Sequence, residues 1–326
     1  MINKYNINYG GRIIMKIAFL FPGQGAQFIG MGKDICENYE EANKIYEQAS
    51  NILGIDVKKM CFEETEEELN KTQNTQIAIA VTSLAILEVL KNKGIKPDVS
   101  VGLSLGEYVA LIYSGYISFK EGIKLLEKRG YYMGSCLPEG KFEMAAVIGL
   151  DSSIIEDVCE RIRANGKFVV PANYNYSDQT VISGETEGIE EAIKELNNLN
   201  SKRIIKLKTS GPFHTEKLNK ARELFSKELE KANFTINENK VIKNIDGDFY
   251  KKDDNIKEIL ANHIVSSVRF DKAIKKMKSE GIDTFVEIGP GKALSGFVKK
   301  ELKSEDIKVF SISDMKSLEE FLEAIN

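Results

Sequence analysis

Five residues in the first third of the chain, Gly102–Gly106 (GLSLG), place a serine between two glycines. Glycines at these positions allow a strand to turn sharply into a helix, so that the serine hydroxyl stands exposed and the next backbone N–H points at an incoming carbonyl. This geometry suits a serine nucleophile and therefore acyl transfer. An ordinary glycine-rich turn is the alternative interpretation of the pentapeptide.

A serine hydroxyl is a weak nucleophile until a base takes its proton, and histidine has a suitable pKa near neutral pH. The chain has two histidines, His214 and His263. His214 follows Gly-Pro-Phe in a loop-like segment, whereas His263 falls in a helix-like stretch, so His214 is the candidate base. A purely structural role stays open for each of them. The sequence identifies no group that would orient the base.

A second glycine-rich turn, Phe21–Gln27 (FPGQGAQ), follows the first strand-like run. It does not match a nucleotide-binding loop, because Phe28 stands where the dinucleotide fingerprint has its third glycine and no Gly-Lys-Ser/Thr follows. A turn at the end of a neighbouring strand can instead present a backbone N–H to an oxyanion, beside the N–H of Leu105. A tight turn without chemistry is the alternative.

The elements around these residues alternate as in an α/β fold. The apolar run Lys16–Phe21 predicts a strand buried on both faces of a parallel sheet, and helical patterns cover 40–51 and 76–92. Residues 97–101 predict a short strand that enters the serine turn, and 107–113 continue as a helix. This order is what an exposed nucleophile on a parallel sheet requires, so we expect an α/β fold.

The pattern changes between residues 141 and 208. Two helical segments, near 152–164 and 186–199, are flanked by strand-like runs in the order β-α-β-β-α-β. This order predicts a small ferredoxin-like domain inserted into the large one.

The remaining chain predicts a return to the large domain. Helical patterns appear near 216–232, 255–264 and 271–280, and strand-like runs at 241–244 and 284–288. We therefore expect a flexible leader over 1–14, a large α/β domain over 15–140 and 209–326, and the small domain over 141–208.

Composition narrows the class of protein. Of 326 residues, 45 are basic and 49 acidic, which gives a net charge of −4. No basic stripe carries interleaved aromatic residues, so nucleic acid is not expected as a partner. Lysines cluster near Lys202, Lys275 and Lys299, where they either cover solvated faces or receive an acidic protein.

Cysteine usage and hydropathy bear on location. Four scattered cysteines form no C-x-x-C pair, which argues against a zinc site and against a disulfide framework. We expect no membrane-spanning helix, because no apolar run is expected to approach the roughly 18 to 20 residues that cross a bilayer. The N-terminus has no signal-peptide pattern. We therefore expect a cytoplasmic protein with no membrane partner.

Together, these motifs resemble those of the malonyl-CoA:acyl-carrier-protein transacylases of bacterial fatty acid synthesis. The resemblance covers nearly all of the chain after Met15. The matching segments, in family order, are Phe21–Gly25, Thr75–Gln76, Gly102–Glu107, Lys128–Gly130, Met144–Ala146, Gly211–His214 and Glu287–Gly291. It implies an α/β-hydrolase-like large domain that carries a small ferredoxin-like one, as the order of elements also predicts.

The resemblance also implies roles for individual residues. Ser104 is similar to the nucleophile of the family and His214 to its general acid/base. The backbone N–H groups of Gln24 and Leu105 are similar to its oxyanion hole. Arg129 is similar to the arginine that binds the malonyl carboxylate, and a planar guanidinium suits that task because it forms two parallel hydrogen bonds with a carboxylate. Without the resemblance, Arg129 is an ordinary surface arginine at a helix end.

Three further positions follow from the same resemblance. Gln76 lies in a shared motif and is expected to support the site. Leu103 stands where the family usually has a histidine, so a polar contact from that side chain is lost, while His214 keeps the role of base. His263 is near a position where the family commonly has glutamine, and it is expected to contribute mainly through its backbone carbonyl.

The implied reaction is a ping-pong transfer of malonyl from malonyl-CoA to the phosphopantetheine thiol of an acyl carrier protein, through an acyl-enzyme on Ser104. No metal or redox cofactor is needed, and a monomer is expected. Three alternatives remain: a trans-acting acyltransferase of a polyketide pathway, an acyl hydrolase, and a noncatalytic carrier-binding subunit. Leu103 and His263 are the only hints of the last.

Overall fold

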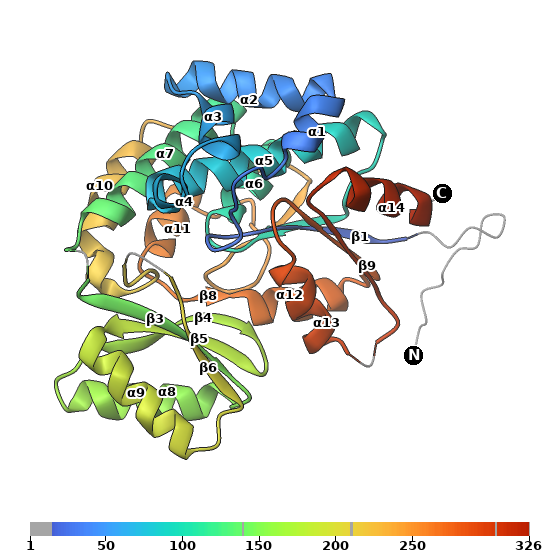
Figure 1. The fold of residues 1–326 in the computed structure, drawn as a ribbon. Helices are drawn as coiled ribbons and strands as arrows, with labels where there is room; N and C mark the ends of the chain where they lie inside the picture. The colour runs from blue at the N-terminus through green and yellow to red at the C-terminus, as the bar shows by residue number, and fades with distance from the viewer. Residues whose placement is uncertain (1–14, 139, 209–210, 304, 326) are drawn as a thin grey trace.

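The computed structural model describes residues 15–138, 140–208, 211–303 and 305–325. The leader predicted over 1–14 lies outside the described residues. Within them, helices surround two five-stranded sheets (Figure 1). The predicted α/β fold class is therefore confirmed.

The larger sheet is parallel throughout, with the strand order β10-β9-β1-β2-β7. Its strands are β1 (Ile17–Phe21), β2 (Val99–Gly102), β7 (Lys240–Ile242), β9 (Thr284–Ile288) and β10 (Lys308–Ile312). Every residue of β1, β2 and β9 is buried, because helices cover both faces of the sheet. The continuous apolar run that predicted β1 reflects this double burial.

The two helical layers differ in size. One face packs against α12 (Phe270–Ser279) and α13 (Ala293–Glu301). The opposite face carries α1 (Lys33–Asn38), α2 (Glu40–Leu53), α3 (Val57–Phe62), α4 (Glu66–Asn70), α5 (Thr72–Asn92), α6 (Gly106–Tyr113), α7 (Phe119–Ser135), α10 (Asn219–Leu229), α11 (Ile256–His263) and α14 (Met315–Ile325). Helix α10 follows a single 3₁₀ turn, Glu216–Leu218, so the helix predicted near 216–232 is shorter than expected.

Helix α5 corrects one expectation about hydropathy. It is long and apolar enough to cross a membrane by length and composition, so the prediction that no apolar run approaches that length is wrong. In the structure, however, 83% of its most apolar window is buried inside the protein. A helix that is apolar on all sides is typical of the centre of a large core, and α5 occupies that place between α2 and α7.

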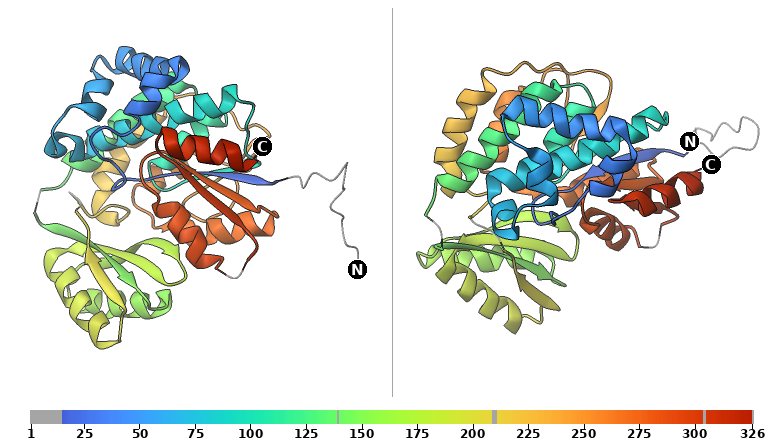
Figure 2. Two further views of the ribbon diagram at one scale, coloured as in Figure 1. Left: turned by 45° about the vertical axis from the view of Figure 1, so that its right-hand side comes forward. Right: turned by 45° about the horizontal axis from the view of Figure 1, so that its top comes forward.

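The second sheet holds the predicted β-α-β-β-α-β order. Its strands are arranged β6-β3-β5-β4-β8, and β3, β4, β5 and β6 pair antiparallel. The elements are β3 (Phe142–Ile148), α8 (Ser152–Ala164), β4 (Val169–Tyr176), β5 (Gln179–Glu185), α9 (Thr186–Asn198) and β6 (Arg203–Lys206). Helices α8 and α9 cover the face that points away from the larger sheet (Figure 2). The residue numbers given above for the domain boundaries stay a prediction.

A short fifth strand, β8 (Val268–Arg269), ties the second sheet to the rest of the chain. It follows α11 and pairs in parallel with Asn173 and Tyr174 of β4. The Arg269 guanidinium lies 4.2 Å from the centre of the Tyr174 ring, and the Ser267 hydroxyl donates a hydrogen bond to the Pro171 carbonyl at 2.7 Å. These contacts attach the segment that follows α11 to the second sheet.

The motif Glu287–Gly291 has a structural explanation. The buried Glu287 carboxylate accepts hydrogen bonds from the backbone N–H groups of Leu294 at 3.2 Å and Ser295 at 2.7 Å, at the start of α13. A carboxylate there satisfies N–H groups that lack partners within the helix and opposes the helix dipole. Gly289 has a φ of 130°, and a Cβ on it would lie 2.2 Å from the Ser83 hydroxyl oxygen, so a side chain is not tolerated.

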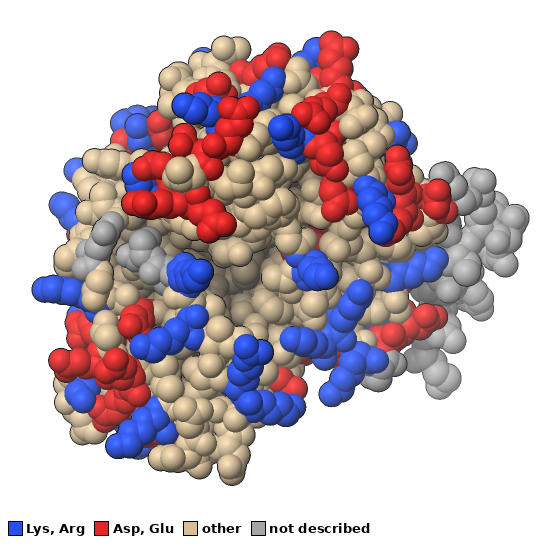
Figure 3. Space-filling model, in the orientation of Figure 1, with Lys and Arg blue, Asp and Glu red and all other residues tan. Residues whose placement is uncertain are grey.

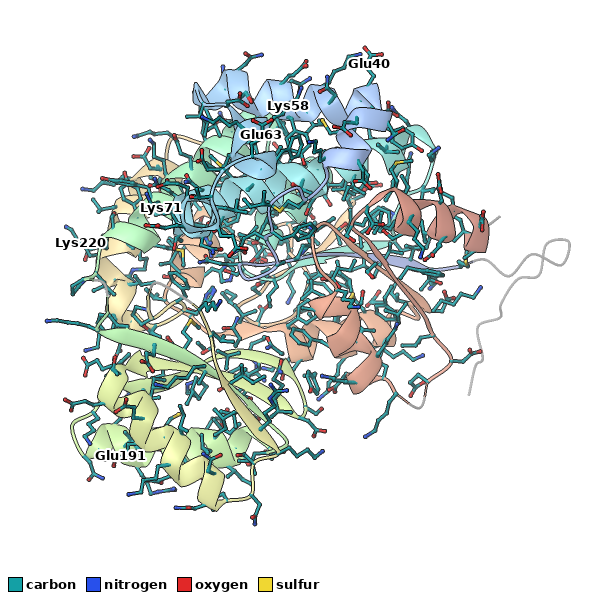
Figure 4. The ribbon with its side chains drawn as sticks, in the orientation of Figure 1. Glu40, Lys58, Glu63, Lys71, Glu191 and Lys220 are labelled. Carbon is teal, nitrogen blue, oxygen red and sulfur yellow. The ribbon has the colours of Figure 1, made fainter. Side chains whose placement is uncertain are left out.

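Charges of both signs are mixed over the surface. Figure 4 shows the labelled side chains Glu40, Lys58, Glu63, Lys71, Glu191 and Lys220 pointing outward from helices and loops. On the face in Figure 3, acidic side chains gather above the recess in the middle of the view, and Lys and Arg side chains lie beside and below it. Most ion pairs here are exposed and contribute little to stability.

Candidate active site

Ser104 lies in a sharp turn between β2 and α6. Its φ is 54°, in the left-handed region that non-glycine residues rarely adopt. A Cβ on Gly102 would lie 1.9 Å from the carbonyl carbon of Gly106, and one on Gly106 would lie 2.2 Å from the Phe21 carbonyl oxygen. Close backbone approach therefore requires both glycines, which is the physical reason given above for the GLSLG pattern.

Asn244 holds this turn from the neighbouring strand. Its side-chain oxygen accepts a hydrogen bond from the Ser104 backbone N–H, and its side-chain nitrogen donates one to the Gly102 carbonyl, both at 2.7 Å. Asn244 is buried and follows β7. Asn244 was not predicted from the sequence. The available signal was that the carboxyl ends of adjacent parallel strands meet at one edge of the sheet.

His214 approaches Ser104 from the turn that follows β6. Its Nε2 lies 2.8 Å from the Ser104 hydroxyl oxygen, and its Nδ1 lies 3.0 Å from the backbone carbonyl oxygen of His263. Because a carbonyl only accepts, Nδ1 carries the proton and Nε2 presents its lone pair to the serine. Burial is the largest of the causes that lower the pKa of His214 well below its usual value, and the neighbouring His263 and Arg129 lower it further. The ring is therefore neutral at pH 7.

Arg129 lies inside α7 and is 1% exposed, so it is not the surface residue that its sequence context alone suggests. One terminal nitrogen donates to the Ser104 hydroxyl oxygen at 3.0 Å, and the other donates to the side-chain oxygen of Gln76 at 2.8 Å. The Nε atom is buried without a hydrogen-bond partner. No acidic side chain of the described residues lies within ion-pair distance of Arg129. The site therefore holds a buried cation that no carboxylate of the described residues contacts.

Gln76 contacts Arg129 rather than the serine. It lies on α5 and is buried, and its side-chain nitrogen is 3.7 Å from the sulfur of Met133. With the amide nitrogen directed at the sulfur, the amide oxygen faces the guanidinium. Gln76 thus orients Arg129 toward Ser104.

The backbone N–H groups of Gln24 and Leu105 fit the expected oxyanion donors. Leu105 opens α6, and Gln24 lies in the loop after β1, where a Cβ on Gly23 would be 2.8 Å from the Leu103 carbonyl oxygen. The loop and the serine turn are therefore in direct contact. Within the described part of the chain, neither N–H donates a hydrogen bond. Both N–H groups are therefore available for the oxyanion role that the resemblance implies.

A cavity of about 480 Å³ opens onto these groups between the two sheets. Its apolar walls include Leu103, Met133, Met144, Val181, Phe213 and Phe297, and its polar wall consists of Asn173, Asn175 and Gln179. Gln24, Gln76, Ser104, Leu105 and His214 line the cavity as well. The predicted site residues therefore come together, with Arg129 and His263 directly behind Ser104 and His214.

Comparison with known proteins identifies the family. The model of the acyl transferase domain matches residues 18–321. The malonyl CoA-acyl carrier protein transacylase of Bacillus subtilis (strain 168) is 41% identical over 304 residues, which cover 93% of this chain and 95% of that protein. The chain belongs to the malonyl-CoA:acyl-carrier-protein transacylase family. The resemblance found in the sequence is thereby confirmed.

Solved structures of the transacylase family share the fold. The enzyme from Clostridium perfringens is 44% identical and superposes with a TM-score of 0.91, over 95% of this chain and 97% of that one. A second structure holds a malonyl-transacylase in complex with a type II PKS acyl-carrier protein; it is 34% identical, with a TM-score of 0.90 over 95% and 99% of the two chains.

None of the four cysteines lines the cavity that opens onto Ser104. All four cysteines are free, and burial raises the pKa of the Cys61 and Cys159 thiols to about 12, so they stay protonated. Among the described residues, no group of three or more histidine, cysteine or acidic side chains is placed to hold a metal ion.

The tight turn around Ser104 gives a stability prediction. We expect Gly106→Ala to destabilise this transacylase by at least about 3 kcal/mol, because the new methyl group would overlap the Phe21 carbonyl, which is fixed by the pairing of β1 with β2. Urea unfolding followed by circular dichroism measures the change.

Gly296→Ala is the matched control. Gly296 lies within α13, and a Cβ there meets nothing within 4 Å. Alanine is expected to stabilise that helix by up to about 1 kcal/mol. Equal unfolding midpoints for the two variants would show that the backbone around Ser104 is not as closely packed as described.

Proposed function

We propose that this chain transfers a malonyl group from malonyl-CoA to the phosphopantetheine thiol of an acyl carrier protein in fatty acid biosynthesis. The observation that carries this proposal is the buried Arg129, which has no acidic partner among the described residues and lies 3.0 Å from the Ser104 hydroxyl. An acyl group that ends in a carboxylate supplies an anion in contact with the guanidinium while its thioester reaches the serine. Family membership supports the same reaction.

The first half-reaction forms the malonyl-enzyme. Ser104 accepts a hydrogen bond from Arg129 and donates its own proton to His214 Nε2 as the oxygen attacks the thioester carbonyl. The carbonyl oxygen becomes an oxyanion that the N–H groups of Gln24 and Leu105 stabilise. The carbon–sulfur bond then breaks, the proton passes from His214 to the sulfur, and coenzyme A leaves.

The second half-reaction reverses these roles with a different thiol. The thiol of the carrier's phosphopantetheine arm gives its proton to His214, and its sulfur attacks the Ser104 ester. The same two N–H groups stabilise the second oxyanion, and the proton returns from His214 to the serine oxygen. Throughout, Arg129 holds the malonyl carboxylate, which positions the acyl carbon.

The cavity suits a ligand that both substrates share. Coenzyme A and the carrier present the same pantetheine arm, an apolar chain with two amide groups. Apolar walls pack against its methylene groups, while Asn173, Asn175 and Gln179 offer amide donors and acceptors. Lys292 also lines the cavity and is exposed, so it favours an acidic phosphate or an acidic carrier surface.

The setting of the proposed reaction is the cytoplasm, with a monomeric enzyme that uses no cofactor of its own. Free, protonated thiols on Cys61 and Cys159 are compatible with a reducing compartment. All groups that the two half-reactions use come from one chain, so a second copy is not required.

A polyketide carrier protein is the second candidate partner, because a relative of 34% identity is seen in complex with one. Transfer of radiolabelled malonyl from malonyl-CoA to purified holo carrier proteins of fatty acid and polyketide pathways tests both. Faster transfer to the fatty acid carrier supports the proposal, and faster transfer to the polyketide carrier reassigns the pathway. Label that appears in free malonate at the same rate with and without carrier would make the protein a hydrolase.

The noncatalytic alternative predicts a different result. A serine-directed fluorophosphonate is expected to label the protein at Ser104, because the hydroxyl is activated by His214 at 2.8 Å. A protein that neither reacts with the fluorophosphonate nor takes up malonyl would be a carrier-binding subunit.

The proposed role of Arg129 gives a prediction about selectivity. We expect Arg129→Ala to lower kcat/KM for malonyl-CoA by about 30- to 1,000-fold, since truncating one partner of a buried charge pair costs about 2 to 4 kcal/mol. Acetyl-CoA has no carboxylate and should lose far less, so the ratio of the two kcat/KM values falls.

Arg129→Lys is the control for this measurement. It keeps the charge and loses the paired donors, so it should retain part of the preference for malonyl-CoA. Circular dichroism confirms folding of each variant. A malonyl-to-acetyl ratio that is the same in wild type and Arg129→Ala would exclude the guanidinium as the carboxylate site.

A further inference from the structure

The side chain of Asn244 bridges two peptide groups of the turn that carries Ser104. It accepts a hydrogen bond from the Ser104 N–H and donates one to the Gly102 carbonyl, each at 2.7 Å. A primary amide has an acceptor on one side and a donor on the other, so one planar group fits both ends of this bridge. Asn244 is 2% exposed, so solvent has little access to either bond.

The backbone of Asn244 is itself held from two directions. Its carbonyl accepts a hydrogen bond from the Arg269 N–H of β8 at 2.7 Å. Its N–H donates to a side-chain oxygen of the buried Glu107 on α6 at 3.4 Å, and the Tyr250 hydroxyl donates to the other oxygen of Glu107 at 2.6 Å. The amide therefore reaches the serine turn from a backbone segment that other elements hold in place.

The bridge also decides which N–H group of the turn stays free. The Leu103 N–H donates to the last carbonyl of β1 at 2.9 Å, and the Gly106 N–H donates to the Leu103 carbonyl at 3.0 Å. Asn244 takes the N–H of Ser104. The N–H of Leu105 is left, and it donates to no acceptor within the described residues. The turn thus directs a single unused donor at the cavity, where an oxyanion would form.

The conformation of Ser104 needs this support. Its φ of 54° is unfavourable for a residue with a side chain, and two hydrogen bonds to a buried amide together offset a cost of that size. Without them, the Gly102 carbonyl and the Ser104 N–H would be buried without partners, and Ser104 would relax toward an ordinary φ. That relaxation would turn the hydroxyl away from His214 Nε2, now at 2.8 Å, and rotate the peptide group that carries the Leu105 N–H.

We propose that Asn244 is a positioning residue for acylation. Its amide holds Ser104 in the strained conformation that places the hydroxyl beside His214 and aims the Leu105 N–H at the developing oxyanion. The proposal rests on the proposed function for the role of Ser104 as nucleophile, and not on the identity of the acyl group or of the carrier. Loss of the bridge therefore slows the reactions of Ser104 and leaves substrate binding in place.

Asn244→Ala removes both bonds of the bridge. We expect the second-order rate constant for labelling by a serine-directed fluorophosphonate to fall about 100-fold, and kcat/KM for malonyl-CoA to fall by a similar factor, because a misplacement of about 1 Å has an effect of that size. Asn244 does not line the cavity, so the affinity for coenzyme A, measured by titration calorimetry, should stay within about threefold of wild type. A purely structural role would lower labelling and binding together.

Asn237→Ala is the matched control. Asn237 supports the far end of α6 with the same kind of bonds: its side-chain nitrogen donates to the Ser114 carbonyl at 2.7 Å, and its oxygen accepts from the Asn239 N–H at 2.8 Å. This variant should label at the wild-type rate even where its unfolding midpoint falls. If Asn244→Ala labels as fast as Asn237→Ala, the proposal is overturned while the proposed function stands. A wild-type protein that is not labelled overturns both.

Amide hydrogen exchange in the wild-type enzyme tests the bridge without any variant. Followed by nuclear magnetic resonance, exchange should be slower at the Ser104 N–H, which is bonded to Asn244, than at the Leu105 N–H, which faces the cavity without an acceptor. Exchange at Ser104 that is as fast as at Leu105 overturns the proposal, and this measurement decides the matter even if Asn244→Ala does not fold.

Discussion

Replacing Ser104 with alanine is expected to abolish the malonyl-enzyme and to lower the rate of malonyl transfer by about 10⁵- to 10⁶-fold. The reason is that the hydroxyl alone in this site is placed to form the ester: it lies 2.8 Å from His214 Nε2 and 3.0 Å from the Arg129 guanidinium. The variant loses one oxygen atom and keeps the Asn244 contacts of the backbone, so folding should be preserved.

Intact mass spectrometry after incubation with malonyl-CoA measures the adduct, and carrier acylation measures the rate. Ser135→Ala is the matched control, because Ser135 is exposed at the end of α7 and lies outside the residues that line the site cavity. It should form the adduct as wild type does. An adduct of the malonyl mass on Ser104→Ala would place the nucleophile elsewhere.

Replacing His214 with alanine is expected to slow acylation by about 10⁴- to 10⁶-fold. Without the ring, no base lies within hydrogen-bond distance of the serine among the described residues, and the serine must attack as a neutral hydroxyl. Because Ser104 and His214 act as a unit, the double alanine variant should be no slower than either single variant. Stopped-flow or quench-flow acylation by malonyl-CoA gives the rates.

Added imidazole provides the control for His214→Ala. The truncation leaves space for a free imidazole next to Ser104, so a rate that rises with imidazole concentration is expected in this variant and not in Ser104→Ala. A His214→Ala enzyme that acylates at the wild-type rate without added imidazole would exclude His214 as the base.

Local patterns predicted the elements whose signals lie in consecutive residues. The apolar residues of β1 are required by burial at their own positions, and the two glycines around Ser104 by close backbone contacts at theirs. The strand and the serine turn were therefore both predicted. Helix α4 was missed although Thr65 accepts a hydrogen bond from the Glu68 backbone N–H, the capping pattern that the Thr-x-x-Glu spacing predicts. That omission was avoidable.

Other elements had no local signal. Strand β8 has two residues and exists because Asn173 and Tyr174 of β4 supply its hydrogen bonds, so nothing in its own sequence distinguishes it from a loop. Strand β10 is only partly buried at the edge of the parallel sheet, and its pattern lacks the continuous apolar character of β1. Contacts between distant parts of the chain created both strands.

The site residues also fall into those that local patterns predict and those that they do not. Residue type and spacing indicated Ser104 and His214 as candidates. Only the resemblance to the family distinguished Arg129 from an ordinary surface arginine. Its burial and the contact with Gln76 come from the packing of α7 against α5, which no single helix pattern contains. The contacts of Asn244 with Ser104 and of the His263 ring with Glu107 were not predicted, because the partners lie more than 100 residues apart in sequence.

In the proposed reaction, Ser104 carries the malonyl group between two thiols. The most direct test of this reaction is to incubate the wild-type protein with malonyl-CoA, remove excess substrate, map the acylated peptide by mass spectrometry, and then add holo acyl carrier protein. We expect malonyl on the peptide that contains Ser104, and its quantitative movement to the carrier's phosphopantetheine arm. Malonyl found on another residue, or released as free malonate without reaching the carrier, would exclude this reaction.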